Sequence, residues 1–140
     1  MTNTFERIYQ EYQIYKKEFG DNIARKEEAL AAYRVLSASL HERGLVFVII
    51  YRQYEESRNN GNENLNFNDY ILEAGECVDC LRENGVKCFT ISSGLTEAIG
   101  KTRELQKAGC RMVGMKEVKG KTDPWSRKQE ILPALVFEIN

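Results

Sequence analysis

The sequence predicts an α/β fold, a single-domain sandwich over residues 1–140 with the element order ααβαβαββ. The apolar runs 45–51 and 86–91 are separated by segments with helical periodicity, and helical crossovers join parallel strands. The polar stretch 119–130 has no helical pattern and suits an antiparallel connection. We therefore expect a mixed, mostly parallel four-stranded sheet that ends in a C-terminal antiparallel hairpin.

The N-terminal part is expected to form a helical hairpin over residues 1–43. Apolar side chains recur at helical spacing through 4–18, and a similar stripe runs through 22–42. The second pattern stops just before Gly44, and a glycine after the last turn is a common end of a helix. The short turn between two such helices favours an antiparallel pair.

The next segments supply the first predicted strand and the first crossover helix. Residues 45–51, LVFVIIY, are apolar on both faces, as is typical of a strand covered on both sides. Residues 53–66 are rich in Asn, Glu and Gly and contain the turn dipeptide Asn60–Gly61, which predicts a solvated loop. Helical periodicity returns over 67–84 and ends at Gly85.

The remaining elements form a β-α-β unit followed by one more strand. They are a strand at 86–91, a helix at 95–108, a strand at 110–118 and a strand at 134–139. Pro133 is expected to open the last strand, because proline is accepted at the first position of a strand. Residues 44–140 should therefore hold the sheet and its two crossover helices.

Bulk properties limit the classes of function. The 140 residues carry 20 basic and 21 acidic side chains, a net charge of −1 at pH 7, so overall charge gives no reason to expect a nucleic-acid partner. The N-terminus has no apolar signal-peptide core, and the longest apolar run is far too short to cross a bilayer. Four cysteines suit a reducing compartment. We expect a cytoplasmic protein without membrane association.

The turn Ser92-Ser93-Gly94 lies between a predicted strand and a predicted helix, which makes it a candidate ligand site. The start of a helix presents unpaired N–H groups, and serine hydroxyls can add donors. Gly94 would let a ligand approach the backbone closely. Ser92, Ser93 and Gly94 could thus bind an anion such as a nucleotide or coenzyme A. The alternative is that a serine only caps the helix, which by itself accounts for these residues.

The basic segment around the single tryptophan is the second candidate site. Positive charge beside an aromatic ring suits an acidic protein surface, or a nucleic-acid backbone with base stacking; a protein partner is favoured. The alternative is a tryptophan folded onto the sheet, since tryptophan is usually at least partly buried. The predicted contact residues are Trp125, Arg127, Lys128, Lys119 and Lys121, together with Glu55 and Glu56 of the acidic loop.

Catalytic and metal-binding motifs are weak in this sequence. Cys77 and Cys80 form a C-x-x-C pair in the middle of a predicted helix, where the helix dipole contributes little, so core packing is favoured. A zinc site would need two further ligands at suitable spacing. The single histidine, His41, lies at a helix end, where the dipole explains it. We expect no metal and no cofactor; whether the protein is an enzyme stays open, with a non-catalytic role favoured.

Three segments resemble the C-terminal half of the GCN5-related acetyltransferases: Ala98–Gly109, Met112–Val118 and Ala134–Ile139. In that family a helix leads into a β-hairpin whose last strand is apolar. The acyl-CoA loop of the family would precede the helix at 67–84, where Asn60–Phe67 has a different pattern. The resemblance implies an acetyltransferase-like shape and gives no catalytic or acetyl-CoA-binding residue.

The chain as a whole is also similar to small α/β proteins carried by mobile elements of Firmicutes. That resemblance implies a regulator or inhibitor of a host defence system, such as an anti-CRISPR protein that acts on a CRISPR nuclease. The sequence has no nucleophile–base pair, histidine cluster or phosphate loop. We expect a non-catalytic cytoplasmic protein that acts by protein–protein contact, with small anionic-ligand binding or a degenerate acetyltransferase as the alternative.

Overall fold

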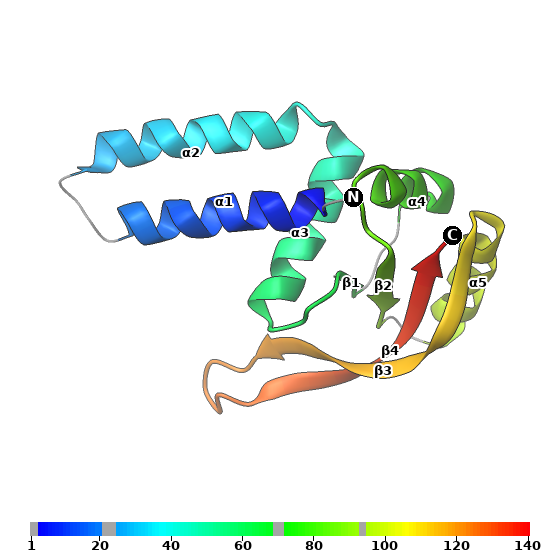
Figure 1. Ribbon diagram of the computed structural model, residues 1–140. Helices are drawn as coiled ribbons and strands as arrows, with labels where there is room; N and C mark the ends of the chain where they lie inside the picture. Colours follow the sequence, from blue (N-terminus) through cyan, green and yellow to red (C-terminus); the bar gives the residue numbers. More distant parts are fainter. Residues whose placement is uncertain (1–2, 21–24, 69–71, 93–94) are drawn as a thin grey trace.

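The computed structural model describes residues 3–20, 25–68, 72–92 and 95–140. Helices and strands alternate through most of this part of the chain, after a helical N-terminal segment (Figure 1). In chain order the elements are α1 (Thr4–Phe19), α2 (Lys26–His41), α3 (Leu45–Asn59), β1 (Asn66–Phe67), α4 (Ala74–Glu83), β2 (Cys88–Ile91), α5 (Leu95–Lys107), β3 (Cys110–Thr122) and β4 (Gln129–Ile139).

The strands of the described residues form one four-stranded mixed sheet in the order β1-β2-β4-β3. β1 pairs with β2 in parallel, and β4 runs antiparallel to both of its neighbours. The α/β class, the mixed sheet and the C-terminal antiparallel hairpin are confirmed. β1, β2 and β3 share one direction, and this was predicted for β2 and β3, which correspond to the strands expected at 86–91 and 110–118. However, β4 inserts between β2 and β3, so β1–β2 is the one adjacent parallel pair and the sheet is not mostly parallel in its pairing.

The segment predicted as the first strand, 45–51, is instead the first half of helix α3. A short apolar run fits a buried helix as well as a buried strand. Its buried residues continue at helical spacing through Tyr54 and Ser57, inside the segment predicted as a loop. The first strand is the two-residue β1, which spans the boundary between the predicted loop 53–66 and the predicted helix 67–84, and that helix begins only at Ala74. With α3 added, the predicted order of the other elements holds.

The other predicted elements are confirmed with shifted ends. β3 and β4 are longer than predicted, so that the expected loop 119–130 shrinks to residues 123–128. Pro133 does not open β4 but lies within it, opposite Glu117 of β3. The other side of β4 is unpaired there, because its pairing with β2 stops at Leu135. Proline's missing N–H therefore costs no inter-strand hydrogen bond on that side.

Aromatic rings build the core of the sheet. Phe89 of β2 stacks on Phe137 of β4 with ring centroids 5.5 Å apart and meets Phe67 of β1 edge-on at 5.7 Å. α4 and α5 contact each other and add Val78, Leu81 and Leu105 to the same cluster. At the N-terminal side, Phe5 of α1 stacks on Phe47 of α3 at 4.6 Å. The hydrophobic core thus extends from the sheet into the helical part.

Helix α3 covers the open edge of the sheet. The Ser57 hydroxyl accepts from the Asn66 N–H at 2.9 Å, and its single hydrogen is shared between the Gln53 carbonyl of its own helix, at 2.7 Å, and the Asn66 carbonyl, at 3.2 Å. One side chain thereby contacts both backbone groups of Asn66, which β1 would otherwise leave unpaired. Beyond α3, the α1–α2 helical hairpin extends away from the sheet (Figure 1). Among the described helices, none combines the length and apolar character needed to span a bilayer.

Candidate functional site

The outer half of the β3–β4 hairpin extends beyond the rest of the sheet (Figure 1). β2 pairs with β4 only between Leu135 and Glu138, so the strands continue past that point as a two-stranded ribbon. Its end, residues 121–128, is called the hairpin tip below. Trp125 lies there with 92% of its surface exposed. The expected alternative, a tryptophan folded onto the sheet, is wrong.

Asp123 fixes the backbone of the hairpin tip. Its carboxylate accepts hydrogen bonds from the N–H groups of Trp125 at 2.8 Å and Ser126 at 3.2 Å. The Asp123 N–H donates to the Lys128 carbonyl at 2.8 Å, and Arg127 adopts a left-handed φ of 59° that closes the turn. The indole is therefore presented from an ordered turn while its ring contacts mainly solvent, which lowers the entropic cost of binding.

Basic side chains accompany the exposed indole. Arg127 and Lys128 flank it at the tip, and Lys119 and Lys121 follow the β3 side of the ribbon; all four are exposed. The structure thus brings the five predicted basic and aromatic residues onto one projecting ribbon. Glu55 and Glu56 are not part of this surface, nor of a loop: both lie on α3 and both are half-buried.

A second candidate site is a cavity of about 420 Å³ at the carboxyl ends of β1 and β2, called the carboxyl-end cavity below. Ligands often bind at this edge of α/β sheets. α3 forms one wall, and the twisted β3–β4 ribbon forms the opposite wall. The lining residues are Gln53, Glu56, Asn68, Ser92, Gly120, Lys121, Glu130 and Leu132. Ser92 of the predicted anion site therefore meets Glu56 and Lys121 of the predicted interaction surface.

A buried polar network lies beneath this cavity. Asn66 accepts a hydrogen bond from the Thr90 hydroxyl at 2.7 Å, and its amide nitrogen donates to Ser92 Oγ at 3.0 Å and Asn68 Oδ1 at 2.9 Å. The Ser92 hydroxyl donates to Asn68 Oδ1 at 3.1 Å. Such a network costs desolvation free energy unless every group is paired, and once paired it holds its members in one geometry.

Of the three residues of the predicted anion site, the structure describes Ser92. Ser93 and Gly94 lie outside the described residues, so their part of the prediction stays a prediction. Ser92 is half-buried, and its single hydroxyl hydrogen is taken by Asn68. In this arrangement Ser92 has no hydrogen left to donate to an anion.

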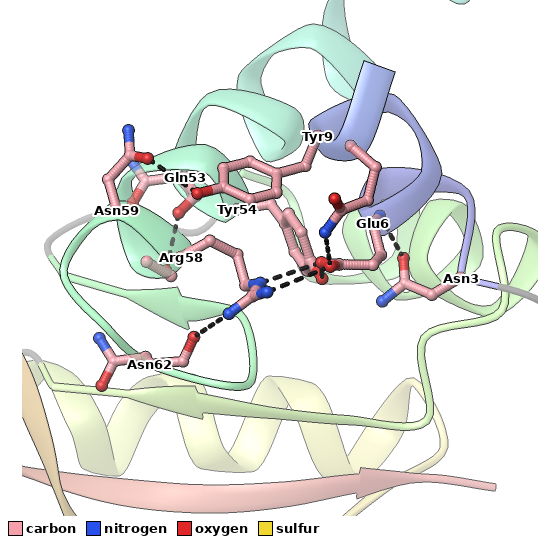
Figure 2. Close-up of polar contacts among 10 residues, drawn as sticks. Asn3, Glu6, Tyr9, Gln53, Tyr54, Arg58, Asn59 and Asn62 are labelled. Atoms are coloured by element: carbon pink, nitrogen blue, oxygen red, sulfur yellow. Dashed lines mark hydrogen bonds and ion pairs between the residues drawn. The ribbon is translucent and has the colours of Figure 1, made fainter. Parts of the chain in front are cut away.

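Figure 2 shows a separate polar cluster, which joins the N-terminal helical hairpin to α3. The Arg58 guanidinium binds the Glu6 carboxylate with both Nε, at 3.0 Å, and Nη2, at 3.2 Å. Tyr54 donates a hydrogen bond to the same carboxylate, and Gln10 donates another at 2.8 Å. Arg58 also lies over the Tyr9 ring, 5.3 Å from its centroid. These contacts connect α1 to α3 at a half-buried position.

Burial and hydrogen bonding oppose each other at Glu6. Partial burial works to raise the pKa of its carboxyl group, but hydrogen bonds from Arg58, Tyr54 and Gln10 outweigh it and hold the pKa below its usual value. Burial and the nearby Glu6 carboxylate raise the pKa of Tyr54, so its phenol stays protonated as the donor. None of Glu6, Tyr54 and Arg58 lines the carboxyl-end cavity, and we interpret the cluster as a structural connection.

The cysteines and the histidine show no arrangement for chemistry. Burial raises the pKa of the Cys77 thiol to about 12, and it also raises the pKa of Cys80 and Cys110, which disfavours reactive thiolates. His41 is exposed, and its ring nitrogen lies 2.7 Å from the Ser37 carbonyl on its own helix. Within residues 3–20, 25–68, 72–92 and 95–140 no group of three potential metal ligands comes together.

Sequence reasoning missed Gln53, Asn66 and Asn68, which belong to the carboxyl-end cavity or its network. Their sequence context is an Asn-rich stretch that reads as a solvated loop. The indication in the sequence was the spacing of Asn66 and Asn68, because residues two apart in a strand have their side chains on the same face. With a strand as short as β1, that signal cannot be recognised without the neighbouring β2.

Comparisons with known proteins give one match. No curated protein and no solved structure matched the chain. The comparisons therefore name neither an acetyltransferase nor a mobile-element protein, and both resemblances stay predictions. The sequence model of one family matches residues 49–139, from within α3 to the last residue of β4. Since this segment covers well over half of the chain, the protein belongs to that family, described as Domain of unknown function (DUF7698).

Proposed function

We propose that this protein is a non-catalytic regulatory or inhibitory protein that binds another protein through its hairpin tip. The observation that carries the proposal is Trp125, which is 92% exposed on an ordered turn. Tryptophan and arginine are the residues most enriched among those that dominate binding energy at protein interfaces. An exposed indole beside Arg127 and Lys128 suits a partner with an apolar pocket and an acidic rim.

The charge of the tip supports an acidic partner. Lys121, Arg127 and Lys128 are exposed cations, whereas the one carboxylate of the tip, Asp123, is occupied by backbone N–H groups. Rim charges of this kind mainly accelerate association and make it sensitive to salt. The predicted class of partner, a nuclease of a bacterial defence system, supplies the first candidates for a binding assay.

Trp125→Ala combined with Arg127→Glu tests the proposal. Loss of an anchor tryptophan alone should weaken binding of a purified partner by about 30-fold or more, as expected for a dominant interface residue. Arg103→Glu is the matched control, because Arg103 is also exposed but lies on α5. If the double variant binds every captured partner as tightly as the unmodified protein, the hairpin tip is not the contact surface.

The same variants should also be tested for binding to nucleic acid. Binding of a fluorescent single-stranded oligonucleotide that weakens steeply with added salt, and that requires Trp125, would favour nucleic acid over protein. The alternative function, binding of a nucleotide or coenzyme A at the turn after β2, stays a prediction, because two of its three residues lie outside the described part of the chain.

A further inference from the structure

Glu56 has few partners for a half-buried carboxylate. It lines the carboxyl-end cavity, and its Oε1 accepts one hydrogen bond, from Asn68 Nδ2 at the long distance of 3.5 Å. Among the described residues it forms no ion pair, in contrast to Glu6, which accepts four hydrogen bonds from side chains. A partly desolvated negative charge with so little compensation would be stabilised by a cation placed in the cavity.

Two groups near Glu56 have unused acceptor capacity. Ser92 gives its hydroxyl hydrogen to Asn68 Oδ1 and keeps an oxygen lone pair. On the α3 wall, Gln53 Oε1 is buried and has no hydrogen-bond partner within the described residues. Gln53 is itself a lining residue of the cavity. These groups favour a ligand that donates several hydrogen bonds.

The rim of the cavity does not reverse this preference. Among the described lining residues, Lys121 and Glu130 are both exposed and their opposite charges offset each other, so the charge of the half-buried Glu56 decides the sign. Gly120 lets the Glu130 side chain lie close against β3: a Cβ at this position would lie 2.9 Å from Glu130 Oε1 and 3.2 Å from Glu130 Cβ. The volume of about 420 Å³ falls within the range of small-molecule sites.

We propose that the carboxyl-end cavity binds a small organic cation, whose ammonium or guanidinium group pairs with the Glu56 carboxylate. A planar guanidinium can donate two hydrogen bonds to one carboxylate, so guanidinium compounds should bind more tightly than simple amines. The proposal does not rest on Trp125 or on a protein partner, and Lys121 belongs both to the hairpin tip and to the cavity lining. The ligand proposed here is positively charged, whereas the sequence predicted a negatively charged ligand at the Ser92-Ser93-Gly94 turn.

Thermal unfolding and calorimetric titration with named probes test this assignment. Agmatine and putrescine at millimolar concentration carry the proposed chemistry, and inorganic phosphate and AMP carry the opposite charge. Agmatine should raise the melting temperature of the unmodified protein by several degrees, because a ligand bound only by the folded state stabilises it. Phosphate and AMP should give no such rise.

Two neighbouring glutamates provide a matched pair of variants. Glu56→Gln should weaken agmatine binding at least tenfold, whereas Glu55→Gln should leave it unchanged, because Glu55 accepts a hydrogen bond from Tyr51 at 3.0 Å and does not line the cavity. Far-ultraviolet circular dichroism checks that both variants fold. If Glu56→Gln loses its fold, Glu56→Asp, which withdraws the carboxylate by one methylene, should weaken binding several-fold in a folded protein.

Three results would overturn the proposal. They are the absence of a shift with both amines in the unmodified protein, equal agmatine affinity in the Glu55 and Glu56 variants, and a larger shift with phosphate or AMP than with agmatine. The last result would instead support an anion site at the turn after β2. Because none of these measurements involves Trp125, they leave the proposed protein-binding function unaffected.

Discussion

The side-chain amide of Asn62 pairs with both backbone polar groups of Lys119. Asn62 Nδ2 donates to the Lys119 carbonyl at 2.7 Å, and Asn62 Oδ1 accepts from the Lys119 N–H at 2.8 Å. The amide thus acts like one residue of an additional strand, and it fastens β3 to the turn that follows α3. Gln129 of β4 contributes a further contact to this turn, donating to the Asn60 carbonyl at 2.6 Å. The ribbon that carries the hairpin tip is therefore held at its base.

Replacing Asn62 should loosen that base. We expect Asn62→Ala to lower the free energy of unfolding by about 1–2 kcal/mol, since two hydrogen bonds are lost at an exposed site. Hydrogen exchange at the Lys119 amide should accelerate, which is the direct readout. Glu63→Ala, a change at the neighbouring exposed residue, should alter neither quantity. Unchanged protection of the Lys119 amide in Asn62→Ala would contradict the role given to this pair.

The Glu6–Arg58 pair should stabilise the protein in a pH-dependent way. The pKa of Glu6 is lower in the folded state than in the unfolded chain, so its contribution is fully present above the unfolded value of about 4.3 and is lost as the pH falls through the folded value. We expect Glu6→Gln to cost about 1–3 kcal/mol at pH 7, because Arg58 keeps its partly buried charge without a full partner. Urea unfolding at several pH values measures this.

A variant at the same helix provides the control for that experiment. Glu11 lies on α1 and is exposed, so Glu11→Gln should change the free energy of unfolding by less than about 0.5 kcal/mol at every pH. The difference between the unmodified protein and Glu6→Gln should shrink below about pH 4. A difference that stayed constant down to pH 2 would show that the charge of Glu6 is not responsible.

Truncation of Phe89 should destabilise the protein strongly, whereas truncation of Trp125 should hardly change its stability. Phe89 is fully buried between Phe67 and Phe137, so Phe89→Ala should destabilise the protein by about 3–5 kcal/mol. Trp125→Ala should change stability by less than about 0.5 kcal/mol, because its ring is exposed. Chemical denaturation measures both. A large loss of stability in Trp125→Ala would mean that the indole packs on the protein rather than serving a partner.

A side chain at Gly109 should strain the backbone and destabilise the protein. Its φ is +98°, and a Cβ there would lie 3.0 Å from Arg82 Nη2, which donates to the Ala108 carbonyl at 3.3 Å. We expect Gly109→Ala to cost about 1–3 kcal/mol in unfolding experiments. Gly114→Ala is the matched control on the following strand, where a Cβ would have no atom within 4 Å. Equal stability of the two variants would argue against strain at Gly109.

The sequence alone predicted much of the fold but only part of the candidate sites. Helical periodicity located α1, α2, α4 and α5, because each presents one apolar stripe to the core. The same reasoning assigned residues 45–51 wrongly to a strand, because seven consecutive apolar residues show no periodicity that separates a helix from a strand. Trp125 and its basic neighbours could be named from composition, whereas the exposure of Trp125 could not, because it depends on how far the ribbon extends beyond β2.

What the sequence determined by itself is local: the α/β class, most helices and strands, and the basic, tryptophan-bearing segment between the last two strands. Tertiary structure decided what depends on distant residues meeting. It made 45–51 a helix that covers the β1 edge, and it placed β4 between β2 and β3. It also brought Glu56, Ser92 and Lys121 around one cavity. The physical reason is that packing and strand pairing join segments that are tens of residues apart, whereas periodicity and turn chemistry act only over a few residues.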